Sequence, residues 1–123
     1  MKIIVTVVTT LFILLWFTYK LVFVWSEPND DPYKRTIKTV EQTKEAIEYY
    51  YSQFNKLPDG LGLNDLVTKE IARDLPMDSW GNEIQFIKLE APKTFLVISY
   101  GADGIEGGKG LNKDIQIIGE VGI

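Results

Sequence analysis

The sequence predicts an α+β protein. It begins with a transmembrane helix, continues with a long amphipathic helix packed on a small antiparallel β-sheet, and carries a glycine-rich loop near the C-terminus. Three observations support this fold class: residues 3–19 are uncharged and almost wholly apolar, apolar residues recur at helical steps from Ile37 to Phe54, and three β-prone runs follow. The predicted organisation is a transmembrane anchor at 1–25, a polar linker at 26–35 and one globular domain at 36–123.

The N-terminal apolar run is long enough for a membrane-spanning helix, which needs about 20 apolar residues. Lys20 can extend its ammonium group to the lipid headgroups, and Trp16, Tyr19 and Trp25 suit the membrane interface. A cleaved signal peptide has a shorter apolar region followed by a small-residue cleavage site, and a soluble core helix has a polar face. The sequence shows neither pattern, so we expect a retained anchor.

The charge and residue types limit the classes of function. Without Lys2 and Lys20 the chain carries 11 basic and 17 acidic residues, a net charge of −6, whereas nucleic-acid binders usually present a basic face. Histidine and cysteine are absent from the sequence, which excludes serine–histidine triads, cysteine nucleophiles, disulfides and thiolate metal sites. We therefore predict no nucleic-acid partner and no enzymatic activity; a carboxylate-only active site is the alternative.

The amphipathic helix is expected to begin near Thr36 and to end before Pro58. A short second helix is expected from Asp65 to Arg73, with Asn64 as its N-cap. Trp80 is expected to fill the core, and Asp78 to bind nearby backbone amides. The three strands are predicted at residues 83–89, 94–100 and 115–118, with a turn at 90–93 between the first two.

A glycine-rich loop follows the second predicted strand. Its five glycines lie between or beside two acids, Asp103 and Asp114. Calcium takes six to eight oxygen ligands, and a glycine-rich backbone can point several carbonyl groups at one place. The two acids span twelve positions, as in an EF-hand, but Ile105 and Gly107 stand where that motif needs side-chain oxygens. A calcium loop and a plain glycine-rich turn with two solvated acids both remain possible.

Several motifs occur in the order found in one family. They are a Tyr-rich helix end before a proline (Tyr49 to Pro58), Gly60-Leu61 with Leu66, the block Pro76-Met77-Asp78-Ser79-Trp80-Gly81-Asn82, the block Ser99-Tyr100-Gly101-Ala102-Asp103-Gly104, then Gly107-Gly108-Lys109-Gly110 and Asp114-Ile115. On these motifs, the chain from about Thr36 to Ile118 resembles the globular domain of the major pseudopilin of type II secretion systems.

The resemblance implies a structural protein of a secretion apparatus. It implies a single-pass anchor in the bacterial inner membrane, a domain on the periplasmic or extracytoplasmic side, and association with other protein subunits, either as a homo-oligomer or with pseudopilus components. It also implies one calcium ion, bound by the carboxylates of Asp103 and Asp114 and by the main-chain carbonyls of Tyr100 and Ile105.

The N-terminal segment differs from the family pattern. Pseudopilins carry a glycine cleavage site and a glutamate soon after it, whereas here no glycine precedes Gly60 and no glutamate precedes Glu27. We therefore expect a pseudopilin-like domain on an ordinary membrane anchor. The alternative is a membrane-tethered extracytoplasmic binding module that does not assemble into a filament.

Overall fold

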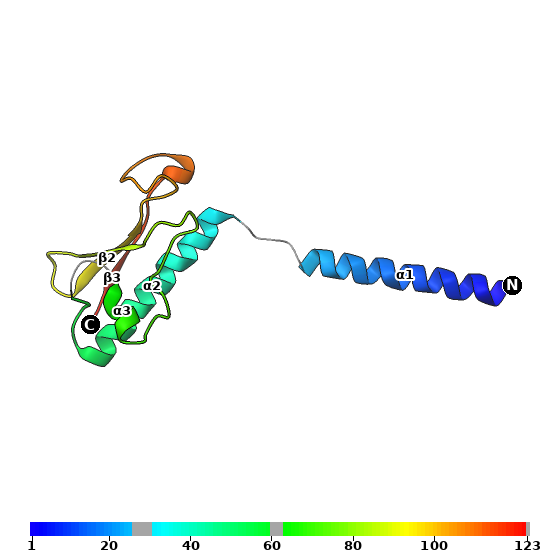
Figure 1. Ribbon diagram of the computed structural model, residues 1–123, viewed down its shortest axis with the longest axis horizontal. Coiled ribbons are helices and arrows are strands. Elements are labelled where there is room, and N and C mark those ends of the chain that lie inside the picture. Colours follow the sequence, from blue (N-terminus) through cyan, green and yellow to red (C-terminus); the bar gives the residue numbers. More distant parts are fainter. Residues whose placement is uncertain (26–30, 60–62, 123) are drawn as a thin grey trace. The chain divides into compact units, whose positions relative to one another are not determined.

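The computed structural model describes residues 1–25, 31–59 and 63–122, with backbone only for 21–25. The chain divides into two units, Met1–Asp30 and Asp31–Ile123. Figure 1 shows a helix in the first unit, and a helix packed on a small sheet in the second. The predicted α+β class is confirmed.

The described residues of the first unit form one helix, α1 (Lys2–Trp25). Its stretch Lys2–Lys20 is long and apolar enough to cross a membrane, although a signal sequence near an N-terminus has the same character. The threonine hydroxyls within it donate to carbonyl groups of the preceding turn, as Thr6 does to Lys2 at 2.7 Å and Thr9 to Val5 at 2.9 Å. These bonds satisfy polar groups that hydrocarbon could not solvate.

The second unit begins with α2 (Pro32–Phe54). The Asp31 carboxylate caps it by accepting the Tyr33 amide at 3.0 Å, and Pro32 stands in the first turn, where its missing N–H costs nothing. The predicted start near Thr36 was therefore wrong, and residues 31–35, assigned to the linker, belong to the helix or its cap. The helix ends at Phe54, before Pro58, because Asn55 takes a left-handed conformation (φ 52°).

The second helix, α3 (Asn64–Thr68), is shorter than predicted. The helix was expected to reach Arg73, but Glu70 has a φ of 58° and the amides of Ile71 and Ala72 both donate to the Leu66 carbonyl at 2.8 and 2.9 Å. Asn64 lies inside the helix, and the N-cap residue is Leu63, so the predicted Asn64 cap was also wrong. The side chain of Leu66 is fully buried, while its carbonyl accepts the amides of this turn.

Within the described residues, the sheet has three antiparallel strands in the order β1-β2-β3: β1 (Gln85–Lys88), β2 (Thr94–Ser99) and β3 (Ile115–Glu120). The first two are shorter than predicted and the third is longer. In the register, Ser99 lies opposite Ile115, and Phe95 opposite Gly119. Gly119 is needed there because a Cβ atom would lie 2.2 Å from the ring of buried Phe95.

The core lies between α2 and the sheet. Along α2 the buried stripe consists of Thr36, Val40, Thr43, Ile47 and Tyr50. Opposite it lie the buried side chains of β2 and β3, with Leu66 of α3 completing the cluster. Trp80 is half-buried and packs against this core, as predicted.

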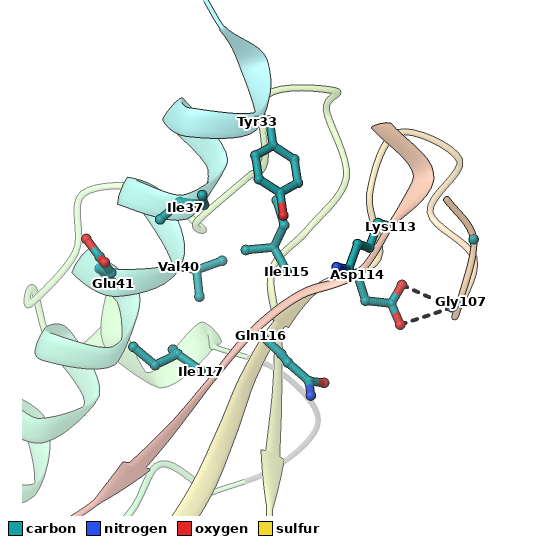
Figure 2. Close-up of a pocket in the computed structure, with 11 residues that line it drawn as sticks. Tyr33, Ile37, Val40, Glu41, Gly107, Lys113, Asp114, Ile115, Gln116 and Ile117 are labelled. Atoms are coloured by element: carbon teal, nitrogen blue, oxygen red, sulfur yellow. Dashed lines mark hydrogen bonds between the residues drawn. The ribbon is translucent and has the colours of Figure 1, made fainter. Parts of the chain in front are cut away.

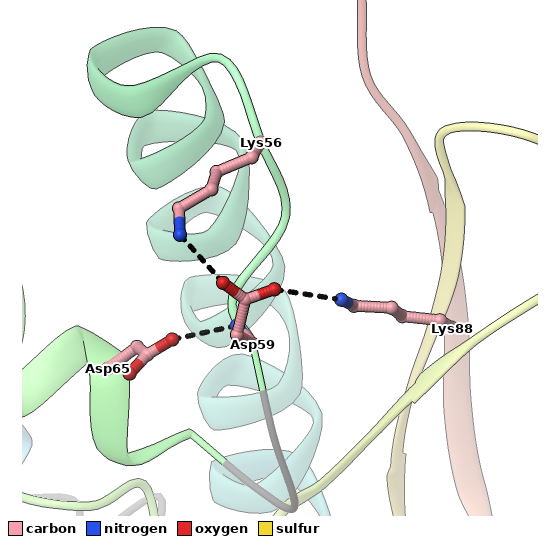
Figure 3. A network of polar contacts seen from close by, with 4 residues as sticks. All are labelled: Lys56, Asp59, Asp65 and Lys88. Carbon is pink, nitrogen blue, oxygen red and sulfur yellow. Dashed lines mark hydrogen bonds and ion pairs between the residues drawn. The ribbon is translucent and has the colours of Figure 1, made fainter.

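The segment after α2 is tied to the sheet by an exposed charge network (Figure 3). The Asp59 carboxylate contacts the ammonium groups of Lys56 at 2.6 Å and Lys88 at 3.5 Å, and the Asp59 amide donates to Asp65 at 2.7 Å. The hydrogen bond and the charge of Lys56 lower the pKa of Asp59 below its usual value, with Lys88 a lesser cause. The same hydrogen bond raises the pKa of Lys56.

The charge network predicts a pH effect. Because the folded-state pKa of Asp59 lies below its unfolded value, its stabilisation is present above the unfolded pKa and is lost as pH falls through the folded pKa. Lys56→Met should raise the Asp59 pKa, measured by NMR titration of the carboxyl carbon, and Lys88→Met should raise it less. An equal or larger rise in Lys88→Met would contradict the assignment of Lys56 as the dominant partner.

Candidate functional site

The glycine-rich loop connects β2 to β3 and contains a short 3₁₀ turn at Gly110–Asn112. Two of its glycines are fixed by close contact with the far side of the loop. A Cβ atom at Gly101 or at Gly108 would lie 2.6 Å from backbone atoms of Asn112, and both glycines have positive φ, at 77° and 99°. The loop is thus folded tightly on itself around Asn112.

Backbone hydrogen bonds close the base of this loop. The Ala102 amide donates to the Leu111 carbonyl at 2.8 Å, directly beside Gly101 and Asn112. One residue further along, Asp103 accepts the Ile105 amide on its Oδ1 atom at 3.2 Å. Asp103 and Ile105 are therefore part of one local turn in an exposed segment.

Asp114 joins the loop from its other end. Figure 2 shows its carboxylate directed at Gly107, whose amide donates to both carboxylate oxygens at 3.0 Å. Asp103 and Asp114 share no hydrogen-bond partner within the described residues, and each orders a different part of the loop. Tyr100, the third predicted ligand residue, is half-buried directly after β2, and the fourth, Ile105, is 67% exposed.

The carboxylate and carbonyl oxygens of these four residues are of the type that binds a hard cation. Each carboxylate keeps lone pairs beyond those used by the loop amides, and backbone carbonyls add further oxygens. In the part of the chain that the structure describes, no group of three or more acidic, histidine or cysteine side chains could hold a metal. A cation here would therefore depend on two carboxylates together with main-chain oxygens.

A buried hydrogen-bond network holds the start of the loop. Asp78 is only 6% exposed, and its Oδ1 atom accepts the amides of Trp80 at 3.0 Å and Asn82 at 2.9 Å, which confirms the predicted local role. Its Oδ2 atom accepts the hydroxyl of Ser99 at 2.8 Å. The Ser99 hydroxyl accepts the Gly101 amide at 3.3 Å, and the Asn82 side chain donates to the Gly101 carbonyl at 3.2 Å. Both backbone groups of Gly101 are thereby fixed.

The same turn also binds α2. Thr36 is fully buried, and its hydroxyl accepts the Ser79 amide at 3.1 Å while donating to the Pro32 carbonyl at 2.8 Å. The first turn of α2, the turn at residues 78–82 and the base of the glycine-rich loop therefore form one connected assembly. The sequence did not predict the hydrogen bonds that Ser99 and Thr36 form in this network. The position of Ser99 directly before Tyr100, within a recognised motif block, was the one available signal.

An open groove lies beside the loop, between the first turns of α2 and the start of β3 (Figure 2). It encloses about 590 Å³ and is bordered by Tyr33, Ile37 and Val40 on one side and by Ile115 and Ile117 on the other. Glu41, Asp114 and Lys113 supply its charged rim.

Comparison with known proteins identifies the family of the chain. Residues 24–118 match the model of a family described as type II secretion system (T2SS), protein G. Because this match covers well over half of the chain, the protein belongs to that family, whose members are structural components of a secretion system rather than enzymes.

One curated relative is the type II secretion system core protein G of Vibrio cholerae serotype O1. It is 30% identical over 95 residues, covering 67% of this chain and 65% of the relative. The chain thus spans slightly less than two-thirds of that relative's length.

The buried network predicts a specific stability loss. Ser99→Ala leaves one oxygen of buried Asp78 without its donor and removes the acceptor of the Gly101 amide, so the free energy of unfolding should fall by about 1–3 kcal/mol. Urea unfolding followed by Trp fluorescence measures this. Ser52→Ala is the control, because Ser52 is exposed and, among the described residues, bonds only within its own helix. Equal effects of the two substitutions would refute the role given to Ser99.

Proposed function

We propose that this protein is a membrane-anchored structural subunit of a type II secretion apparatus and acts through association with other protein subunits. In this proposal α1 lies in the bacterial inner membrane and the second unit lies on the periplasmic side, with a calcium ion stabilising its glycine-rich loop. Family membership and the apolar character of Lys2–Lys20 support the anchored, structural part of the proposal.

The geometry of the loop supports the calcium part. The Ala102–Leu111 bond closes the loop base, Asp103 follows at once, and Asp114 binds back to Gly107, so both acids belong to one closed segment. A divalent cation bound by both carboxylates would join the two parts of the loop that they order separately. We assign Asp103 and Asp114 as side-chain ligands and the carbonyls of Tyr100 and Ile105 as main-chain ligands, with water completing the shell.

Calcium would have a structural effect rather than a catalytic one. A glycine-rich loop loses much conformational entropy when it becomes ordered, and a ligand that binds only the ordered form offsets this loss. The stabilisation follows mass action and reaches about 2.7 kcal/mol at a hundredfold excess over the dissociation constant. An ordered loop also fixes Gly107 and Asp114, which border the groove beside β3.

Calcium titration of the chelator-treated full chain in detergent tests this proposal, with the melting temperature as the readout. We expect a saturable rise of several degrees that is largely lost in Asp103→Asn and in Asp114→Asn. Glu106→Gln is the matched control, because it removes one acidic charge from the same exposed loop without removing a proposed ligand. The calcium-induced rise is compared, rather than the melting temperature itself, because Asp114→Asn also weakens the bond to Gly107.

Two outcomes of this titration would contradict the proposed calcium site. If millimolar calcium leaves the melting temperature unchanged, or if Glu106→Gln lowers the calcium effect as much as the two aspartate substitutions, the assigned site is wrong. The protein would then be better described as a membrane-tethered domain with a metal-free loop.

A further inference from the structure

In the part of the chain that the structure describes, the sheet has two edge strands, β1 and β3, and they are protected differently. β1 spans only Gln85–Lys88 and carries Lys88, whose ammonium group lies 3.5 Å from Asp59. Short length and a lysine are usual devices that prevent an edge strand from pairing with another chain. β3 spans six residues, Ile115–Glu120, and contains no lysine, arginine or proline; its one charge is at its end.

The outer side of β3 is open. In an antiparallel pair, alternate residues point their N–H and C=O groups away from the partner strand, here β2. Within residues 31–59 and 63–122, no backbone group outside the sheet forms a hydrogen bond to Ile115–Glu120. The groove of about 590 Å³ borders the start of β3, and a second groove of about 530 Å³ borders its end at Glu120 and Val121. The two grooves therefore leave open space beside the start and the end of β3.

The solvent face of β3 carries a large apolar side chain between two polar ones. Burial alternates along the strand, so that Gln116, Ile118 and Glu120 point away from the core. Ile118 is 61% exposed although it is a large apolar side chain. An exposed isoleucine alone is ordinary on a protein surface, but here it lies at the middle of an unprotected edge strand.

We propose that β3 pairs antiparallel with β3 of a second copy of this chain and joins the two sheets into one. In such a pair the two-fold axis is perpendicular to the sheet, so opposite residues lie on the same face and the central residue faces its own counterpart. Both copies then keep α2 on the same side of the combined sheet.

The side chains of β3 favour a second copy as the partner. If the pair is centred on Ile118, the two Ile118 side chains meet, and each Gln116 lies opposite Glu120 of the other copy. A glutamine amide can donate to a glutamate carboxylate, so the two outer pairs are complementary in both directions. A pair centred on Ile117 would instead place Asp114 opposite Glu120, with like charges facing each other. The strand is therefore complementary to itself in one register.

Cysteine crosslinking of the full chain tests this pairing, since the natural sequence contains no cysteine. Paired residues have Cα atoms about 4.5–5.5 Å apart, within the range of a disulfide. Ile118→Cys, oxidised mildly in detergent and in membranes, should give at least a severalfold larger disulfide-linked dimer fraction than Ile87→Cys. Ile87 is the matched control, because it is an exposed isoleucine on the other edge strand.

A second pair of variants tests the proposed register of the β3–β3 pair. A mixture of Gln116→Cys and Glu120→Cys chains should crosslink more than either variant alone.

Equal dimer fractions for Ile118→Cys and Ile87→Cys would overturn the proposal, as would crosslinking of Ile118→Cys to a different protein in membranes. The inference deepens the proposed association but does not use the calcium site. A chain that binds calcium yet forms no Ile118→Cys dimer therefore refutes only the strand pairing.

Discussion

The buried carboxylate of Asp78 is the group on which the arrangement of the second unit depends. A charge removed from water costs several kcal/mol unless hydrogen bonds replace its hydration. Asp78 obtains two such bonds from its own turn, at Trp80 and Asn82, and a third from Ser99 at the end of β2. The turn and the strand must therefore stay together, because separating them would leave an oxygen of a buried charge unpaired.

The position of the glycine-rich loop follows from this requirement. The Ser99 hydroxyl accepts the Gly101 amide, and the Asn82 side chain donates to the Gly101 carbonyl. These two bonds fix the direction in which the loop leaves β2. Thr36 connects the same turn to α2, which brings the first turns of that helix beside the loop and forms the groove between them. The proposed calcium site is thus built on a rigid base, although the loop itself is exposed.

The sequence predicted the kinds of elements well, because each depends on local pattern. Periodicity located α2 and the strands, but the helix begins at Pro32 because a proline after a capping aspartate starts a helix rather than ending the preceding linker. α3 is short because Glu70 takes a positive φ and the amides of Ile71 and Ala72 turn back to the Leu66 carbonyl, which helix propensity does not reveal. Calcium binding by Asp103 and Asp114 remains a prediction.

The network around Asp78 shows why the site could be predicted only in part. The local bonds of Asp78 follow from its position in a turn, but Ser99 lies 21 residues away in the chain and meets Asp78 only through the packing of the sheet. Similarly, Thr36 and Ser79 are 43 residues apart. Polar contacts over such separations depend on the whole fold, so two motif blocks could be recognised in the sequence while their connection could not.

Hydrogen exchange of the loop amides in Asn82→Ala tests most directly whether this network holds the loop. The substitution removes the bond to the Gly101 carbonyl but keeps the backbone amide that Asp78 accepts. Exchange at Ala102 and Gly107 should then become faster, while amides of the β1–β2 ladder keep their wild-type rates. Unchanged exchange at Ala102 and Gly107 would contradict the claim that the buried network positions the loop.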